Sequence, residues 1–270
     1  MLFGSILAGL AAGFVAEKIV NWITRNWHAQ SIGEDATLFE SLKFLGFRLL
    51  KQIYGLIAFF VVAQLVTTNL ITPEMAQFAQ VIVINVVVLP RVALAMGRFL
   101  LAPNRPEHRL IATDDWTAKY LYWHQFGIFL LMGLSSGIIE FNVLNDVPMG
   151  TSRLGLWLNL SVHVYFVYIT WRAWDGLIAM ARGRDVLSPF EDRLARWYPG
   201  YLIGVAVFTW LLVNVIVSFG MFEVLSTAPH YKMMLLLAFG PAFDTAIRAL
   251  VRHLVPPMQG ECMIAERAYL

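Results

Sequence analysis

The chain has 270 residues, of which 59% are hydrophobic and 14% charged, with a formal net charge of +2. Soluble domains carry about 25% charged and 45–50% apolar residues. The composition therefore excludes a water-soluble enzyme, a disordered protein and a nucleic-acid-binding protein. It predicts an all-α, polytopic membrane protein with about seven transmembrane helices. The apolar runs are continuous rather than alternating, which favours helices over a β-barrel.

The N-terminal third of the chain predicts three spans. The apolar run 1–23 lacks the basic start and the cleavage site of a signal peptide, so we interpret it as a span. Residues 39–53 place basic residues among apolar ones at helical spacing, which is typical of an amphipathic helix. This helix leads into a span at 54–71, and a short turn precedes the third span, 78–101.

Two polar stretches, 102–120 and 181–197, interrupt the rest of the chain. Four further apolar runs predict spans at 126–141, 154–174 (running on to Met180), 201–222 and 233–251. The last residues become apolar again, which indicates the start of another helix at the end of the chain.

Lys and Arg predict the orientation. Fifteen of the 20 lie in the segments 24–53, 98–123, 182–198 and 248–270, whereas the opposite loops carry only Arg153 and Lys232. Because cytoplasmic loops are rich in Lys and Arg, the basic segments are expected inside. With seven spans, the N-terminus lies outside and the C-terminus in the cytoplasm. An outside N-terminus suggests an exported segment before Met1.

The spans also predict an internal repeat. After the first span and its linker, 1–38, the chain divides into three helical hairpins, 39–112, 113–187 and 188–257. Two spans per unit keep every hairpin in one orientation, whereas the inverted repeats of secondary transporters need an odd number. The pattern favours stacked hairpins over an alternating-access transporter.

Charged residues within the spans are the first candidates for function. Arg91 and Arg98 are two helical turns apart and share a face. There they bind lipid headgroups, link to a neighbouring helix, or reach the interface past a kink at Pro90. Two spacings predict intrahelical ion pairs, Arg172 with Asp175 and Asp244 with Arg248. We expect both pairs to neutralise themselves where helices meet.

Polar and small residues inside the spans predict contacts between helices. Interhelical hydrogen bonding explains the polar residues Asn85, Asn159, His163 and Asn214. Gly133 and Gly137 are four residues apart, a spacing that lets two helix backbones approach closely.

Aromatic residues gather where the cytoplasmic stretches lead into spans, and we interpret them as interface anchors. They are Trp116, Tyr120, Trp123, Trp197 and Tyr201. The six histidines show no metal-ligand spacing, the single cysteine is Cys262, and no nucleophile or phosphate-loop motif occurs. The sequence therefore predicts no catalytic residue, no metal site and no cofactor.

The stretch 99–123 resembles the long, multi-helix YbiO-like branch of the mechanosensitive channels of small conductance, the MscS superfamily. The matching residues are Ala102, Pro103, Pro106, Arg109, Leu110, Asp114, Ala118 and Tyr120. The first span, with Glu17 as the matching acidic residue, is similar to the helix that follows the exported domain of such proteins. The closing AERAYL, 265–270, resembles the approach to the helices before the pore, so 258–270 is expected to connect to a pore region. The pore helix and the cytoplasmic β-domain of that family do not occur in this chain.

The resemblance implies the tension-sensing part of a channel subunit in a bacterial inner membrane, with seven subunits around one pore and membrane lipids as partners. It implies no enzymatic activity. Arg91, Arg98, Arg182 and Arg184 are then expected to hold lipid headgroups. Two other interpretations stay open. A secondary transporter, or a subunit of one, predicts a polar site from Asn159, His163, Asn214 and Asp244, and a non-conducting scaffold shares every feature except a pore.

Overall fold

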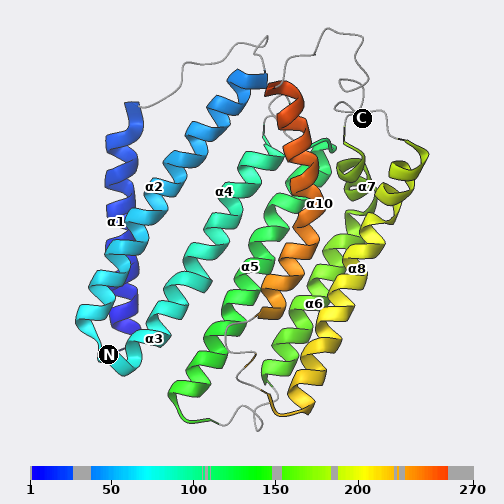
Figure 1. Cartoon of the computed structure of the whole chain (residues 1–270). Coiled ribbons are helices and arrows are strands. Elements are labelled where there is room, and N and C mark those ends of the chain that lie inside the picture. The colour runs from blue at the N-terminus through cyan, green and yellow to red at the C-terminus, as the bar shows by residue number, and fades with distance from the viewer. Residues whose placement is uncertain are drawn as a thin grey trace.

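A computed structural model describes residues 2–26, 38–104, 106, 109, 111–147, 154–183, 188–221, 224 and 229–254 (Figure 1). Every regular element in these ranges is helical, as the composition predicts. The elements are α1 (Leu2–Ile23), η1 (Thr24–Asn26), α2 (Leu38–Leu70), α3 (Pro73–Val81), η2 (Ile82–Val88), α4 (Leu89–Leu101), α5 (Asp115–Leu144), α6 (Leu154–Arg172), α7 (Trp174–Arg182), α8 (Pro189–Ser218) and α10 (Pro229–Leu254).

Six helical stretches in the described ranges are long and apolar enough to cross a membrane. They are Leu2–Ile23, Gly46–Leu70, Met75–Leu101, Asp115–Leu144, Leu154–Arg172 and Pro189–Ser218. The chain is therefore consistent with a multi-pass membrane protein. The predicted seventh span, 233–251, lies within α10, which is helical but is not one of the six. The count of seven stays a prediction.

Helix boundaries follow the polar residues that precede the apolar runs. Asp114 caps α5 by accepting a hydrogen bond from the Thr117 backbone N–H at 2.9 Å. Ser188 and Glu191 form a reciprocal capping box at the start of α8. The amphipathic segment and the second span form one continuous helix, α2. The fifth span was predicted as one run from 154 to 174 that continues to Met180. In the structure α6 ends at Arg172, and a separate helix, α7, begins at Trp174.

Helices that are consecutive in sequence are neighbours in space. In Figure 1, α1, α2, α4, α5, α6 and α8 stand side by side, and α10 crosses in front. Contacts join α1 to α2, α2 to α4, α4 to α5, α5 to α6, α6 to α8 and α8 to α10. The order agrees with antiparallel helices on short connections, whereas the grouping into three equivalent hairpins stays a prediction.

Glycines set two of the closest helix contacts. A Cβ added at Gly133 would lie 2.0 Å from the carbonyl oxygen of Asn85, so α5 packs directly on the backbone of η2. A contact surface at Gly133 is therefore confirmed. Gly9 and Gly13 play the same part between α1 and α2, where a Cβ would lie 2.8 Å from the carbonyl oxygens of Ala63 and Phe59, respectively.

The third span changes its helical form before Pro90. Residues Ile82–Val88 form a single π-helical segment, and the N–H of Leu89 bonds to the carbonyl of Ile84, five residues earlier. Pro90 has no N–H to offer the carbonyl four residues before it, and its ring clashes with that carbonyl in a regular α-helix. A π turn is one way to accommodate this interruption.

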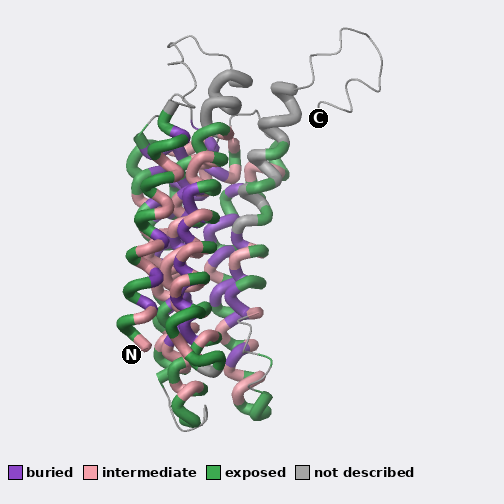
Figure 2. Tube along the Cα trace, turned by 90° about the vertical axis from the view of Figure 1, so that its left-hand side faces the viewer, coloured by how far each residue is buried: buried purple, intermediate pink, exposed green. Residues whose placement is uncertain are grey.

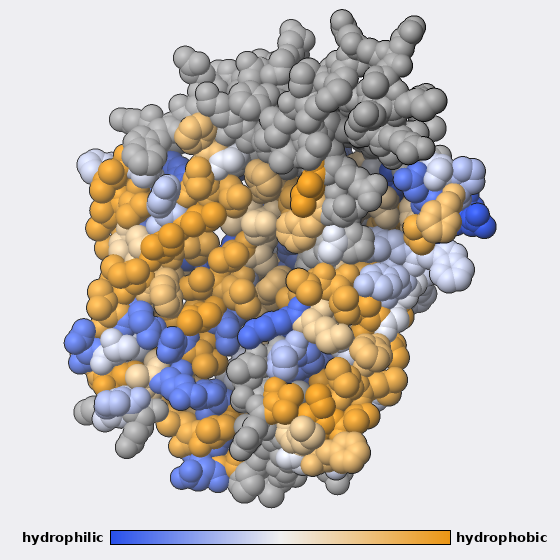
Figure 3. All heavy atoms as spheres, viewed as in Figure 1, coloured by the Kyte–Doolittle hydropathy of each residue, from blue (hydrophilic) through white to orange (hydrophobic). Residues whose placement is uncertain are grey.

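Few residues of the candidate spans are fully buried within the chain. Buried residues lie where helices face one another, and exposed residues cover the outside (Figure 2). In the six candidate spans, between 17% and 33% of the most apolar stretch is buried. The visible outer surface is largely hydrophobic (Figure 3). Such a surface suits lipid chains or neighbouring membrane helices rather than water.

Candidate functional site

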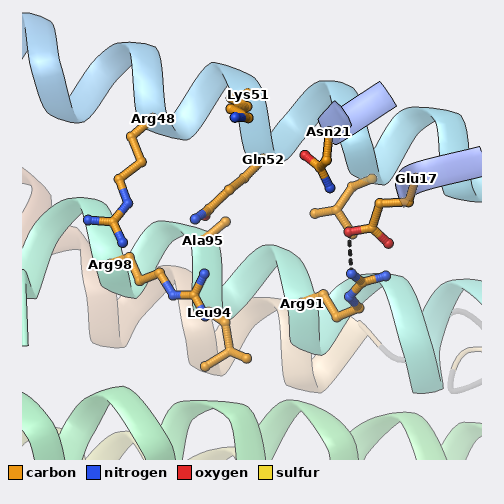
Figure 4. A pocket seen from close by; sticks show the side chains of 10 residues that line it. Glu17, Asn21, Arg48, Lys51, Gln52, Arg91, Leu94, Ala95 and Arg98 are labelled. Atoms are coloured by element: carbon orange, nitrogen blue, oxygen red, sulfur yellow. Dashed lines mark hydrogen bonds and ion pairs between the residues drawn. The ribbon is translucent and has the colours of Figure 1, made fainter. Parts of the chain in front are cut away.

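A pocket of about 440 Å³ lies between α1, α2 and α4 (Figure 4). Its lining residues are Glu17, Asn21, Arg48, Lys51, Gln52, Leu56, Arg91, Leu94, Ala95 and Arg98. Four of these side chains are cationic and one is a carboxylate. With these groups ionised, the pocket has a formal excess of three positive charges.

Glu17 and Arg91 form an ion pair at one end of the pocket. Arg91 Nη2 donates to Glu17 Oε1 at 2.5 Å, and the two side chains are 26% and 15% exposed, respectively. The Arg91 guanidinium carbon also lies 5.2 Å from the ring centroids of Phe14 and Phe59. Transfer of charged side chains into hydrocarbon costs free energy, so an ion pair within the candidate spans is a candidate for function.

The depth of Arg91 follows from its place in the third candidate span. That span runs from Met75 to Leu101, so Arg91 lies three residues past its midpoint. At a rise of about 1.5 Å per residue, this is about 5 Å from the middle of the span. Arg98 lies about 10 Å farther along the same face. The pocket therefore extends from the end of α4 nearly to the centre of the span.

Arg98 stands at the other end of the pocket. Its Nε donates to the Tyr122 hydroxyl at 2.7 Å, and its guanidinium carbon lies 5.8 Å from the Tyr122 ring centroid. Arg48 and Gln52 extend from α2 toward α4 in Figure 4. The two helices thus present positive groups to the same space.

The other predicted cation sites lie apart from this pocket. Arg182 Nε binds Asp192 Oδ1 at 2.8 Å, and Arg196 pairs with the same carboxylate. Arg184 lies outside the described residues. Arg172 and Asp175 fall on different helices, and the Arg172 guanidinium carbon lies 5.9 Å from the Trp116 ring centroid. The predicted pairing on one continuous helix is therefore not formed. Asp244 and Arg248 lie in α10, but their side chains are outside the described part.

The predicted anchor residues are mostly exposed. Trp116, Trp123, Trp197 and Tyr201 are 50%, 62%, 76% and 44% exposed, respectively. Tyr120 is less exposed, and it stacks on Trp116 with ring centroids 4.8 Å apart. The Tyr201 hydroxyl donates to the Leu237 carbonyl at 3.3 Å. Exposed aromatic rings in the first four turns of α5 and α8 are compatible with interface anchoring, which stays a prediction.

A second polar cluster joins α6 to α10. Asn159 Nδ2 lies 3.0 Å from His230 Nε2 and 3.3 Å from the Tyr231 hydroxyl. His163 Nδ1 donates to the Asn159 carbonyl at 2.8 Å, since a carbonyl only accepts. All four residues are buried. The expected role of Asn159 in interhelical hydrogen bonding is confirmed, whereas Asn214 Nδ2 bonds within its own helix to Trp210 O.

Most of the residues that carry the family resemblance lie in the connection between α4 and α5, whereas Ala118 and Tyr120 lie in α5. Ala102 takes a left-handed conformation with a φ of 36° and ends α4. Arg109, only 5% exposed, donates to the Leu101 carbonyl at 3.0 Å, to the Thr113 carbonyl at 2.5 Å and to Asp115 at 2.7 Å. Beside it, burial raises the pKa of the Asp114 carboxyl, but hydrogen bonds from Thr117 outweigh this and hold the pKa below 3.8.

Comparisons of the chain with protein-family models, curated proteins and solved structures found no match. In the described residues, no group of three or more His, Cys, Asp or Glu side chains is placed to hold a metal ion. The cationic pocket is therefore the candidate site with the clearest chemistry. Its arrangement suits an anion, because guanidinium groups bind carboxylate and phosphate oxygens.

Proposed function

We propose that this chain is the membrane-tension-sensing part of a mechanosensitive ion channel subunit that releases ions and solutes under osmotic stress. The observation that carries the proposal is the small buried share of every candidate span, 33% at most. An array with so much surface facing its surroundings has a long boundary with lipid. Membrane tension favours the conformation with the larger in-plane area, so a sensor needs helices whose packing changes with the bilayer.

The helical irregularities support the same proposal. The chain breaks at Ala173 between α6 and α7, and the third span contains the π-helical segment. Such positions are where long helices bend. The Arg109 hydrogen bonds connect α4 to α5, so a tilt of one helix is transmitted to the next.

The proposal includes an assembly and a location. The distribution of Lys and Arg favours an outside N-terminus and a cytoplasmic C-terminus in a bacterial inner membrane. The family resemblance favours seven subunits around one pore. In this arrangement the described helices form the outer, lipid-facing part of each subunit.

Two measurements test the proposal on protein extracted from its own membrane. Native mass spectrometry should give a subunit well above 30.5 kDa in a seven-subunit assembly. Patches of liposomes containing that assembly should show stepwise currents that increase with applied suction. A 30.5 kDa subunit that is single or paired would overturn the channel proposal. So would a seven-subunit assembly that stays silent up to the tension at which the patch ruptures.

A secondary transporter is the alternative that one observation favours, because the cationic pocket reaches nearly to the middle of a span. Substrate flux without applied tension would support this alternative, and loss of that flux in Arg91→Gln would assign the transport site to the pocket. A non-conducting scaffold predicts neither flux nor current.

A further inference from the structure

We propose that His163 on α6 and His230 on α10 bind a divalent transition-metal ion such as Zn²⁺ between the two helices. The inference goes beyond the proposed function, because a metal site at this place is compatible with a channel, a transporter and a scaffold alike. Its support comes from two ring nitrogens without partners, from one residue that contacts both rings, and from the place of the cluster near helix ends.

Each of the two histidines keeps one ring nitrogen without a hydrogen-bond partner among the described residues. These atoms are His163 Nε2 and His230 Nδ1, and Asn159 Oδ1 of the same cluster also has none. His163, His230 and Asn159 are only 3%, 7% and 6% exposed, respectively, so bulk water does not supply the missing partners. Buried polar atoms without partners cost free energy. An ion that takes up two imidazole nitrogens removes this cost, and imidazole is the commonest metal ligand in proteins.

Asn159 contacts the other ring nitrogen of both histidines. Its backbone carbonyl accepts the Nδ1–H of His163 at 2.8 Å, which leaves the Nε2 lone pair free for a metal ion. Its side-chain amide lies 3.0 Å from His230 Nε2. When this amide turns over, Oδ1 accepts an Nε2–H, and the lone pair of His230 Nδ1 is free as well. Metal-binding histidines almost always donate their second nitrogen to a carbonyl, a carboxylate or water, so Asn159 orients both rings as a metal site requires.

The separation of the two rings suits one shared ion. Their centroids lie 6.4 Å apart, and their planes are inclined by 17°. Because Zn–N bonds are about 2.0–2.1 Å long, two imidazoles on one Zn²⁺ have their centroids about 5–6.5 Å apart. The observed separation is at the upper end of this range, so binding is expected to draw α10 slightly toward α6.

The cluster lies near helix ends, where an ion can reach it. His230 is the second residue of α10, and Asn159 is the sixth residue of α6. At a rise of about 1.5 Å per residue, Asn159 is about 8 Å from the start of its helix. The segments before both helices carry few basic residues, so these ends are predicted to face the outside. The ion is therefore expected to enter from outside the cell rather than from the cytoplasm.

Water completes the coordination of the ion. Zn²⁺ is usually four-coordinate, so two imidazoles leave positions for water. In the described part of the chain, no carboxylate joins the two histidines in a group that could hold a metal. Zn²⁺ makes a bound water acidic enough to ionise near neutral pH, and the released proton passes to solvent. The hydroxide that remains on the ion lowers the charge that the buried site must hold.

The experiment titrates the full-length assembly, purified without a polyhistidine tag, with Zn²⁺ in isothermal titration calorimetry. His163→Gln and His230→Gln should each weaken binding at least about a hundredfold, because each removes one of the two imidazole ligands. Asn159→Ala should weaken binding about tenfold to a hundredfold, because it removes the orienting amide but no ligand. His124→Gln is the matched control and should bind as the wild type does, because His124 belongs to a different contact, with the Tyr165 hydroxyl 2.7 Å from its Nδ1.

X-ray absorption at the zinc edge counts the ligands of the wild type without any substitution. Two imidazoles on the ion support the site, and fewer than two overturn it. Equal Zn²⁺ affinity in His163→Gln, His230→Gln and His124→Gln also overturns it, as does Mg²⁺ binding at the Zn²⁺ affinity, since Mg²⁺ prefers oxygen ligands. Each variant is first compared with the wild type by thermal unfolding in a metal chelator. If a glutamine variant unfolds early, the ligand count of the wild type decides.

Discussion

Gly133→Ala should destabilise the protein through one backbone contact. The added Cβ would lie 2.0 Å from Asn85 O, 2.5 Å from Asn85 C and 3.0 Å from Val86 N. All three are backbone atoms of η2 that cannot rotate away, so α5 and η2 must separate by about 1 Å. Overpacking of this kind costs about 1–3 kcal/mol, and the better helix propensity of alanine returns about 1 kcal/mol. We therefore expect a net loss of up to about 2 kcal/mol.

Gly204→Ala is the matched control, because nothing lies within 4 Å of a Cβ at this exposed position in α8. There the substitution should stabilise the helix by about 0.5–1 kcal/mol. Equilibrium unfolding in mixed micelles with increasing SDS, followed by circular dichroism, measures both variants. If Gly133→Ala is as stable as Gly204→Ala, then the close approach of α5 and η2 is refuted.

Three further changes test other contacts in the same unfolding assay. Gly97→Ala should destabilise the protein, because the added Cβ would lie 1.7 Å from the Gln125 amide nitrogen, which donates to the Ala93 carbonyl. In a Gln125→Ala background, Gly97→Ala should cost less unfolding free energy. An equal cost in both backgrounds would refute the clash. Arg109→Lys should lower the free energy of unfolding by about 1–3 kcal/mol, because an ammonium cannot bind the two carbonyls and the carboxylate with the geometry of the guanidinium. An Arg109→Lys variant as stable as the wild type would contradict this expectation. Asp114→Ala should cost about 1 kcal/mol at pH 7. Because the Asp114 pKa is lowered, that stabilisation is complete above pH 3.8 and is lost as the pH falls through the lower folded value, whereas Asp114→Asn should show no such loss.

The spans were predictable because hydrocarbon requires long continuous apolar runs, and six of them are helices of sufficient length. The break at Ala173 was not, since residues 154–174 read as one apolar run. Gly9 and Gly13 had a signal, because they are four residues apart. Gly4 and Gly9 do not share this spacing, and a Cβ at Gly4 would meet nothing within 4 Å.

The site was only partly predictable. Helical spacing places Arg91 and Arg98 on one face, and both line the pocket. The sequence does not say which helices face each other. It therefore gives Arg48 and Lys51 only as basic residues of the amphipathic segment 39–53, and Glu17 only as an acidic residue of the first span. The polar cluster shows the same limit, because His230 and Tyr231 meet Asn159 from about 70 positions away in the chain.

The π-helical segment also sets the register of α4. In a π-helical turn, the backbone hydrogen bond joins residues that are five apart instead of four, so the turn contains one additional residue. Each residue of a helix turns it by about 100°. Everything after Val88 is thereby rotated about a quarter of a turn relative to the helix before Ile82. A span one residue shorter in this segment would have nearly the same hydropathy, length and charge. It would direct Arg91 away from Glu17 and Arg98 away from Tyr122, so the length of a single helical turn decides which neighbours these two arginines meet.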